Sequence, residues 1–443
     1  MRALRLRRPT GGLWQHGDFL KLWSAETISQ FGTQITGLAL PLAAILVLKA
    51  SAFEVGLLAT LEFLPFLLFT LPAGVWVDRL RRRPILVAAD LGRAALLASV
   101  PIAYAFDVLR IEHLYVVAFA TGVLTVFFDV AYQSYLPSLV ARDELVEGNS
   151  KLEVSRAGAQ IAGPGLAGAL VGLIKAPPAI ALDAASFVAS AAFLARIGRR
   201  EEPVTRGDRE ARPRMLPELK EGLRYVLGHR YLRSIAASTA SFNFFGSLAG
   251  AVLLVYAVRR LHLSPELIGL AMTLASIGPL IGALTATRIS RRLGVGPTII
   301  LSSFVAGPAY VLVPVAPEGA AALALIVPAF ALSGLANVVY NVTQVSLRQA
   351  MAPERIQGRM NAVMRFLVWG TIPLGSFAGG ALASRIGLRP TIWVGALGAC
   401  LPFLPVLLSP VRTLRTVPEA EPEAEPPAVA IPTPPAPAGA GES

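Results

Sequence analysis

The chain has 443 residues, of which 54% are hydrophobic and only 15% are charged, and its mean hydropathy is +0.60. Soluble domains rarely have this composition, so we expect an integral membrane protein. The formal net charge is +12, and it must be located along the chain before it is taken as a sign of a nucleic-acid partner.

Long apolar stretches recur along the chain, each of about the 20 residues that cross roughly 30 Å of hydrocarbon. A membrane-spanning backbone must satisfy its own hydrogen bonds, as helices and closed barrels do. Continuous apolar runs without alternation favour helices. We therefore predict an all-α polytopic membrane protein with twelve transmembrane helices. The expected spans are 22–48, 54–77, 85–106, 114–136, 153–174, 178–197, 234–257, 267–287, 297–316, 320–344, 361–384 and 390–409.

A charged segment after residue 198 separates the spans into two groups of six, and the groups resemble each other. "FEVGLL" at 53–58 is similar to "ELIGLA" at 266–271, and "ELVEGN" at 144–149 is similar to "ERIQGR" at 354–359, at an offset of 209 to 213 residues. Duplicated six-helix units are typical of transporters whose binding site lies between the repeats near the bilayer midplane. The expected domains are a basic segment 1–18, a six-helix bundle 19–198, a linker 199–233, a second bundle 234–410 and a tail 411–443.

The linker and the tail differ in composition. In the linker, Leu219, Leu223 and Leu227 recur at helical spacing. This pattern indicates an amphipathic helix on the inner membrane face, although a simple tether is the alternative. The tail is rich in proline and glutamate, cannot bury a core, and is expected to be disordered.

The positive charges are unevenly distributed over this topology. With the N-terminus placed in the cytoplasm, 30 of the 40 lysines and arginines fall in cytoplasmic segments and 7 in outer loops. Positive residues concentrate in the cytoplasmic loops of membrane proteins. We therefore expect a plasma (cytoplasmic) membrane protein with both termini in the cytoplasm, and no nucleic-acid partner.

Few residues suit cofactor or catalytic chemistry. Cys400 is the single cysteine, and the four histidines are scattered over helix ends and loops. No lysine follows a glycine, so a phosphate-binding GxxxxGK[ST] loop is absent. No span carries a nucleophile beside a base. We therefore expect no cofactor, no metal site and no enzyme activity.

The segment "GVWVDRLRRRP" at 74–84 concentrates charge between two apolar spans. Topology alone explains arginines in an inner loop, but it does not explain the acid or the glycine one turn before it. The pattern resembles the signature that the major facilitator superfamily carries in the loop between its second and third helices. The resemblance implies a glycine that allows close helix contact and an Asp-Arg network that latches the inner gate. The matching positions are Gly74, Asp78, Arg79, Arg82 and Arg83, whereas Arg81 stands in place of a glycine of the signature.

The resemblance covers the chain from Asp18 to about Pro410, in segments such as "FLKLWSAETISQFGTQITGLALPL" and "LVEGNSKLEVSRAGAQIAGPGLAGALVG". These segments resemble the branch of the superfamily that includes the enterobactin exporter and macrolide efflux proteins. Within the second segment, "GPGLAG" resembles a helix signature of exporters and keeps Gly163, Pro164 and Gly168. Proline kinks a helix and glycine permits close packing. The resemblance therefore implies export.

Acidic and basic residues of the first half are candidates for the inner gate. At the repeat offset, Asp78 corresponds to Arg291, so the acid of the latch is lost in the second half. We therefore expect the main inner gate in the first half. The pairs at i,i+3 spacing in this set are equally compatible with static pairing. The set comprises Asp78, Asp90, Arg93, Glu153 and Arg156.

Polar side chains recur at helical spacing on four spans, which match the cavity-lining helices of the resembled superfamily. An ionisable residue within a span is costly and marks a functional hypothesis. Glu26 and Asp129 are the stronger candidates for proton coupling, and Asp183 is expected to be a packing residue. The candidates for substrate binding or coupling are Glu26, Gln30, Gln34, Glu62, Asp129, Gln133, Asn243, Asn337, Asn341 and Gln344.

These patterns together predict a secondary active transporter that exports a small amphipathic compound in exchange for protons, by alternating access. The compound would be a drug, a siderophore or another natural product, and the polar cavity suits neutral or cationic amphiphiles. The expected partners are this substrate, protons and the lipid bilayer, and we expect a monomer. The alternatives are an importer of the same fold and a non-transporting sensor or assembly protein.

Overall fold

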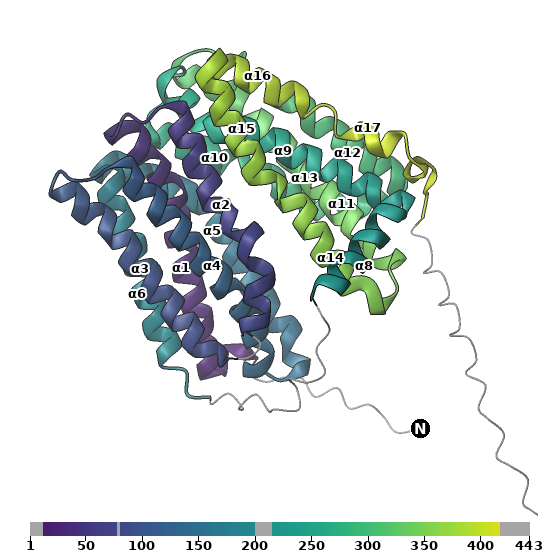
Figure 1. Cartoon of the computed structure of the whole chain (residues 1–443), viewed down its shortest axis with the longest axis horizontal. Coiled ribbons are helices and arrows are strands. Elements are labelled where there is room, and N and C mark those ends of the chain that lie inside the picture. Colours follow the sequence, from purple (N-terminus) through teal and green to yellow (C-terminus); the bar gives the residue numbers. More distant parts are fainter. Residues whose placement is uncertain (1–11, 78–79, 200–214, 417–443) are drawn as a thin grey trace, which may run out of the picture.

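The computed structural model describes residues 12–77, 80–199 and 215–416, which form helices and turns and no β-strand. Within these ranges, eleven helical segments are long and apolar enough to cross a membrane, and Val295–Tyr310 is a shorter apolar helix. The helices form two bundles, one from each half of the chain (Figure 1). The all-helical, polytopic architecture predicted from the apolar stretches is therefore confirmed.

The first bundle has six spans. Helix α1 packs against α5 and α6, α3 packs against α4 and α6, and α2 packs against α4. Close approach of α1 to α6 requires Gly32, because a Cβ there would lie 2.3 Å from Oδ1 of Asp183. The helices are α1 (Gly17–Leu42, continued by a π-helical turn Ala43–Val47), α2 (Ala52–Val77), α3 (Arg82–Ala105), α4 (Ile111–Leu139), α5 (Leu145–Ile174) and α6 (Ala176–Ala195).

The second bundle repeats these neighbour relations. Helix α9 packs against α15 and α16, and α13 packs against α11 and α12, as α1 and α4 do with their counterparts in the first bundle. Its helices are α9 (Arg230–Arg259), α10 (Pro265–Ala275), α11 (Ile277–Leu293), α12 (Val295–Tyr310), α13 (Leu323–Met351), α14 (Glu354–Trp369), α15 (Thr371–Ile386), α16 (Leu388–Gly398) and α17 (Phe403–Leu407).

Three spans of the second bundle are broken, whereas 267–287, 361–384 and 390–409 were each expected to be one helix. The span 390–409 is interrupted between α16, which ends at Gly398, and α17, which begins at Phe403. Helix α10 ends at Ala275, four residues before Pro279, and α14 ends at Trp369, four residues before Pro373. A proline ring clashes with the carbonyl four residues earlier and offers no N–H. The breaks in 267–287 and 361–384 therefore follow from the two prolines.

Helix α12 is shorter than the expected span 297–316. It contains Pro308 and ends at Tyr310, and the chain continues in turns with i→i+3 bonds, such as Val313 N to Tyr310 O at 3.1 Å. The proline removes one helical donor near this end. The apolar segment therefore completes its path as a tighter turn structure.

A helix also lies in the described part of the linker, α8 (Met215–Gly228). One of its faces packs against α14, where Gly222 lies against the backbone of Arg359 and Val226 is fully buried. Leu223 and Leu227, on the stripe read from the sequence, remain exposed. Helix α8 is thus held to the second bundle and presents Leu223 and Leu227 outward.

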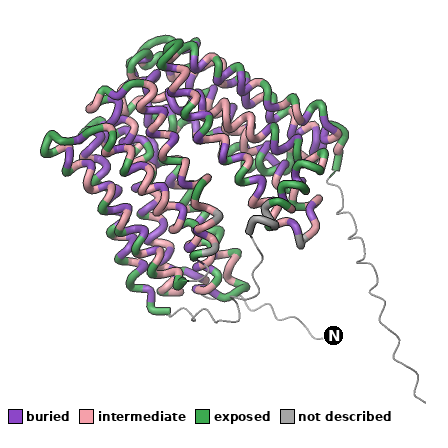
Figure 2. The backbone as a smooth tube through the Cα atoms, viewed as in Figure 1, coloured by how far each residue is buried: buried purple, intermediate pink, exposed green. Residues whose placement is uncertain are grey.

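The two bundles are joined at one end and separate at the other. A single buried apolar cluster contains side chains of both halves, among them Val55 and Ala383. Near the end that carries α8, each half has a cluster of its own, around Phe19 in the first and Val226 in the second. Figures 1 and 2 show the bundles diverging toward the end that carries α8, with buried residues inside each bundle.

Helix pairs α2/α15 and α5/α10 form the joined end. Gly56 lies against Gly380, and Gly168 lies against Gly269, at distances that leave no room for a Cβ. Arg259 adds a hydrogen bond across the halves, since its Nη2 donates to the carbonyl of Ala50 at 2.6 Å. The opposite end is therefore the one where space between the halves is accessible.

Candidate functional site

The first half contains a pocket of about 330 Å³ with four carboxyl side chains, which we call the acidic pocket. The carboxyls come from four different helices, α1, α2, α4 and α6. Glu26 accepts a hydrogen bond from Nε2 of Gln30 at 2.7 Å, one helical turn away. The ionisable residues that line the pocket are Glu26, Glu62, Arg93, Asp129 and Asp183.

Arg93 is the single cation lining this pocket among the described residues. Its guanidinium lies between two aromatic rings, 4.3 Å from the centroid of Phe128 and 4.1 Å from that of Phe187. It donates to the carboxylate of Asp90, and both side chains are almost completely buried. Arg93 also acts electrostatically on Glu26, Asp129 and Asp183, so one fixed positive charge serves several acids.

The chemistry open to the acidic pocket is proton exchange. Burial disfavours the charged form of a carboxyl group, and a nearby cation favours it. The acids outnumber the cation here, so full ionisation would bury uncompensated negative charge. Such a set can take up or release a proton when the helices move relative to Arg93.

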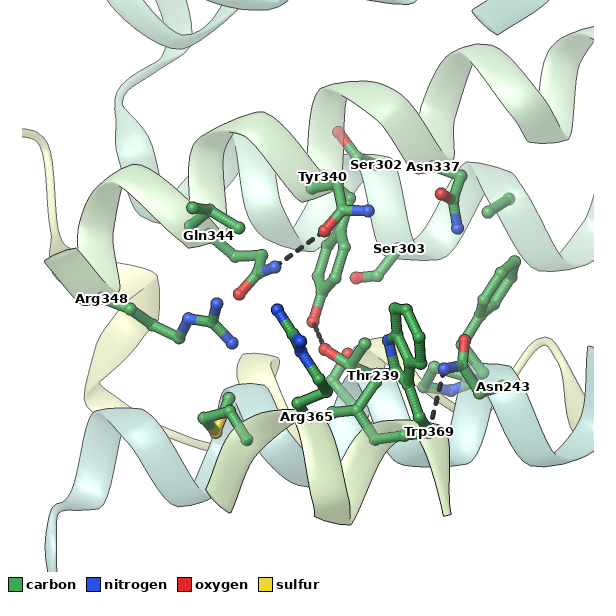
Figure 3. A pocket seen from close by; sticks show the side chains of 18 of the residues that line it. Thr239, Asn243, Ser302, Ser303, Asn337, Tyr340, Gln344, Arg348, Arg365 and Trp369 are labelled. Atoms are coloured by element: carbon green, nitrogen blue, oxygen red, sulfur yellow. Dashed lines mark hydrogen bonds between the residues drawn. The ribbon is translucent and has the colours of Figure 1, made fainter. Parts of the chain in front are cut away.

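The second half contains a larger pocket of about 440 Å³, which we call the cationic pocket (Figure 3). Among the described residues that line it there are two arginines and no acid. Thr239 and Tyr340 share a hydrogen bond of 2.7 Å, and Nε2 of Gln344 donates to Oδ1 of Asn341 at 2.9 Å. Its polar side chains include Thr239, Asn243, Asn337, Tyr340, Asn341, Gln344, Arg348, Asn361 and Arg365.

A third pocket of about 320 Å³ lies between the halves, lined by α2, α4 and α14. It shares Phe66 with the acidic pocket and shares Asn361, Arg365 and Trp369 with the cationic pocket. The rings of Phe66 and Trp369 lie 6.1 Å apart in an edge arrangement across the halves. The three pockets therefore adjoin in series, with an aromatic pair at the centre.

The structure brings most of the predicted binding residues to these pockets. Glu26, Gln30, Glu62 and Asp129 line the acidic pocket, and Gln133 lines the central one. Asn243, Asn337, Asn341 and Gln344 line the cationic pocket. Gln34 lies elsewhere, because its side chain packs on Gly163 of α5. Asp183 lines the acidic pocket and also accepts a hydrogen bond from Ser186 at 3.0 Å.

The predicted gate residues are more dispersed. Asp78 and Arg79 lie outside the described residues. Arg82 and Arg83 belong to the first turn of α3 rather than to the preceding loop. Arg83 donates from Nε to the carbonyl of Leu194 at 3.0 Å, which ties α3 to the end of α6. Within the described part of the chain, no atom of a neighbouring helix lies within 4 Å of a Cβ placed on Gly74, so none of these helices requires the glycine in the present conformation.

The paired gate candidates lie in two different environments. Asp90 and Arg93 are buried beside the acidic pocket. Glu153 and Arg156 form an exposed pair with Nη2 to Oε1 at 2.8 Å. Gly168 contacts α10 of the other half, as does Pro164 through its carbonyl, whereas Gly163 contacts α1.

Sequence reasoning missed the two arginines of the cationic pocket. Arg348 follows Gln344 by four residues, so it continues the polar face of Asn337 and Asn341 on the same helix. Arg365 lies within the predicted span 361–384 but is not among the predicted site residues. Helical spacing could have identified Arg348, and the cost of a charge in a span could have identified Arg365.

The geometry defines a polytopic helical transporter, built from two related halves around a cavity that opens toward one end. A family model described as Major Facilitator Superfamily matches residues 22–370 and 234–440. The chain therefore belongs to the Major Facilitator Superfamily. It is a multi-pass membrane transporter and not an enzyme.

Similar proteins include named efflux pumps. Multidrug efflux pump Tap of Mycolicibacterium fortuitum is 28% identical over 398 residues, which cover 88% of this chain and 94% of that protein. Macrolide efflux protein A of Streptococcus pyogenes is 23% identical over 402 residues, which cover 89% of this chain and 97% of that protein. Resemblance to a macrolide efflux protein, expected from the sequence segments, is thus confirmed.

Solved structures share the fold at low identity. A bacterial homologue of the iron transporter ferroportin in an inward-facing state gives a TM-score of 0.72 at 18% identity, covering 88% of this chain and 98% of that chain. An outward-facing structure with the same description gives 0.56 at 19% identity, with the same coverage.

Proposed function

We propose that this transporter exports a small amphipathic compound, such as a drug, a siderophore or another natural product, in exchange for protons. The observation that carries the proposal is the acidic pocket, in which several carboxyls share one guanidinium, that of Arg93, among the described residues that line it. Glu26 and Asp129 come from different helices, α1 and α4, which lie on the cavity side of the first half. Movement of the halves would change their exposure, and with it their protonation.

The direction of transport rests on two supports. Relatives that align along nearly the whole chain are named for multidrug and macrolide efflux. The "GPGLAG" segment also lies at the contact between the halves, where Gly168 packs on Gly269. We therefore favour export over import and over a sensor or assembly function.

Charge and shape support the orientation that we propose in the cytoplasmic membrane. The excess of lysine and arginine on one side supports cytoplasmic termini and a cytoplasmic linker. Helix α8 belongs to this linker, so the diverging end would face the cytoplasm. The higher TM-score with the inward-facing structure supports the same placement. The protein would then receive its substrate from inside, and we propose that it acts as a monomer.

Reconstitution in proteoliposomes tests proton-driven export. A proton gradient should drive a lipophilic fluorescent dye against its own gradient, and a protonophore should abolish this. The Glu26→Gln, Asp129→Asn double variant should lose uphill transport yet retain downhill exchange, because the cavity remains while proton binding is lost. Uphill export by the double variant would contradict the proposed coupling. Dye movement in the opposite direction would indicate an importer, and no movement of any dye would favour a non-transporting role.

A further inference from the structure

Arg348 and Arg365 face the cationic pocket from two adjacent helices, α13 and α14. Figure 3 shows both guanidinium groups directed into the pocket, beside Gln344 and Tyr340. Neither arginine forms an ion pair with an acid in the described part of the chain. Asp129, which lies in the other half, interacts electrostatically with Arg365 across the central pocket. Both charges therefore remain available to a molecule in the pocket.

Unused hydrogen-bonding groups lie next to these charges. Nε of Arg348, a donor, and Oε1 of Gln344, an acceptor, are buried without a hydrogen-bond partner. Buried polar groups are normally satisfied, and leaving one unpaired is costly. Asn361 lines the same space with an amide donor, whereas the hydroxyls of Thr239 and Tyr340 are bonded to each other and to the carbonyl of Ile235. The guanidinium groups and the amide can therefore donate several hydrogen bonds to one compact polar group.

The charge of that group follows from the lining. Guanidinium groups present fixed forks of N–H donors that match the two oxygens of a carboxylate, sulfonate or phosphate. A cationic group would instead meet two positive charges and no acid. The acidic pocket of the first half would repel an anion, so the second half is the side on which an anion docks.

We propose that the exported compound carries an oxyanion group that binds between Arg348 and Arg365, while its apolar body lies against Trp369 and Phe66 in the central pocket. This inference rests on the proposed export function and reverses the charge expected from the polar helix faces alone. The rings of Trp369 and Phe66 lie next to Arg365 and offer an apolar surface for the remainder of the molecule. An amphiphile with one acidic end fits this order of groups.

Two probes that differ in one anionic group test whether the pocket binds an anion. Anilinonaphthalene sulfonate and phenylnaphthylamine share an aromatic body and differ in the sulfonate. Their binding would be measured by equilibrium dialysis against the full-length protein in phosphatidylcholine nanodiscs, with empty nanodiscs subtracted. For Arg348→Gln, Arg365→Gln we expect the affinity for the sulfonate dye to fall at least about tenfold, or about 1.4 kcal/mol. The affinity for the uncharged dye should change by less than about twofold, or about 0.4 kcal/mol.

Control variants keep this test interpretable. Arg288→Gln removes an exposed arginine of α11 outside the three pockets and should leave both affinities unchanged. The double variant Arg348→Lys, Arg365→Lys keeps both positive charges but removes the paired N–H donors of the guanidinium groups. It should retain part of the affinity for the sulfonate dye. If the glutamine variant fails to fold, the lysine variant and the two single substitutions still separate the dyes. Equal loss of both dyes, or unchanged binding of the sulfonate dye, would overturn the proposal.

An anionic lipid headgroup offers the same chemistry as a soluble anion. Addition of phosphatidylglycerol to the nanodiscs distinguishes the two sources. If the lipid competes with the sulfonate dye in the wild type and not in the lysine or glutamine variants, the pocket binds headgroups and the assignment to substrate is wrong. Absence of competition supports a soluble anionic substrate. Binding is measured without a gradient, so a failure of proton-driven export would leave this result standing.

Discussion

Gly168 of α5 and Gly269 of α10 pack backbone to backbone across the two halves, since a Cβ on Gly168 would lie 2.9 Å from the Cα of Gly269 and 2.4 Å from the carbonyl oxygen of Pro265. The repeat offset of 209 to 213 residues relates this contact to the one between Gly56 and Gly380. The joined end is therefore held by two equivalent close contacts.

Gly168→Val should loosen the joined end. Overpacking costs about 1–3 kcal/mol, and this cost falls only on the conformation in which the two glycines touch. The population of the opposite conformation should then rise about tenfold or more, because about 1.4 kcal/mol corresponds to a factor of ten.

Cysteine labelling measures this shift. In a Cys400→Ser background, a cysteine at Thr33 of the acidic pocket should react faster with an impermeant maleimide applied from the end opposite α8. Gly246→Val is the matched control, since no atom lies within 4 Å of a Cβ placed there. Equal labelling of both variants would show that the Gly168 contact does not hold the two halves.

The topology can be tested by labelling at two positions. In the Cys400→Ser background, a cysteine in place of Asp208, in the linker, should react from the cytoplasmic side. A cysteine in place of Pro317, between α12 and α13, should react from the outside. Reaction of both from one side would contradict the number of crossings between them.

Asp78→Asn tests the latch suggested by the charged segment at 74–84, a position outside the described residues. If the carboxylate holds the inner gate through neighbouring arginines, its loss removes a charged hydrogen bond of about 1.5–3 kcal/mol. Transport in proteoliposomes should fall about tenfold or more, with expression and substrate affinity retained. Unchanged turnover would leave these arginines with a topological role alone.

The buried pair of Asp90 and Arg93 should contribute to the stability of the folded protein. Arg93→Met leaves the Asp90 carboxylate buried without its cation, and breaking a buried pair from one side costs about 3–5 kcal/mol. Thermal unfolding in detergent should show a clear loss of stability. The Asp90→Asn, Arg93→Met double variant should recover much of that loss, because both charges are then gone. Equal instability of the single and double variants would indicate that the aromatic packing around Arg93 dominates.

The sequence alone predicted the helices because hydrocarbon imposes a minimum apolar length and internal hydrogen bonding. The breaks after Ala275 and Trp369 were not predicted. Each lies four residues before a proline, but Pro65 of α2 and Pro164 of α5 lie inside continuous helices. Side-chain surroundings were not predictable either. Periodicity places Gln34 on a polar face of α1, but it cannot show that Gly163 of α5 receives this side chain.

The candidate site was likewise only partly predictable from the sequence. Spacing identified Asn337, Asn341 and Gln344 as one face, because residues three and four apart are neighbours on a helix. The enclosure of Arg93 depends on Phe128 and Phe187, which come from α4 and α6. No local pattern encodes that meeting of three helices, since it arises only when the bundle closes.

The proline breaks give the two contacts between the halves an unequal mechanical character. At each contact an unbroken helix of the first half, α2 or α5, packs against part of an interrupted span of the second half, α15 or α10. The breaks lie at Gly370, ten residues before Gly380, and at Ser276, seven residues after Gly269. Hinges of this kind absorb backbone rotation at few positions. The segments of the second half beyond these breaks would thus bend as hinged elements, while the segments docked on the first half stay in place. The first half would move as a rigid body.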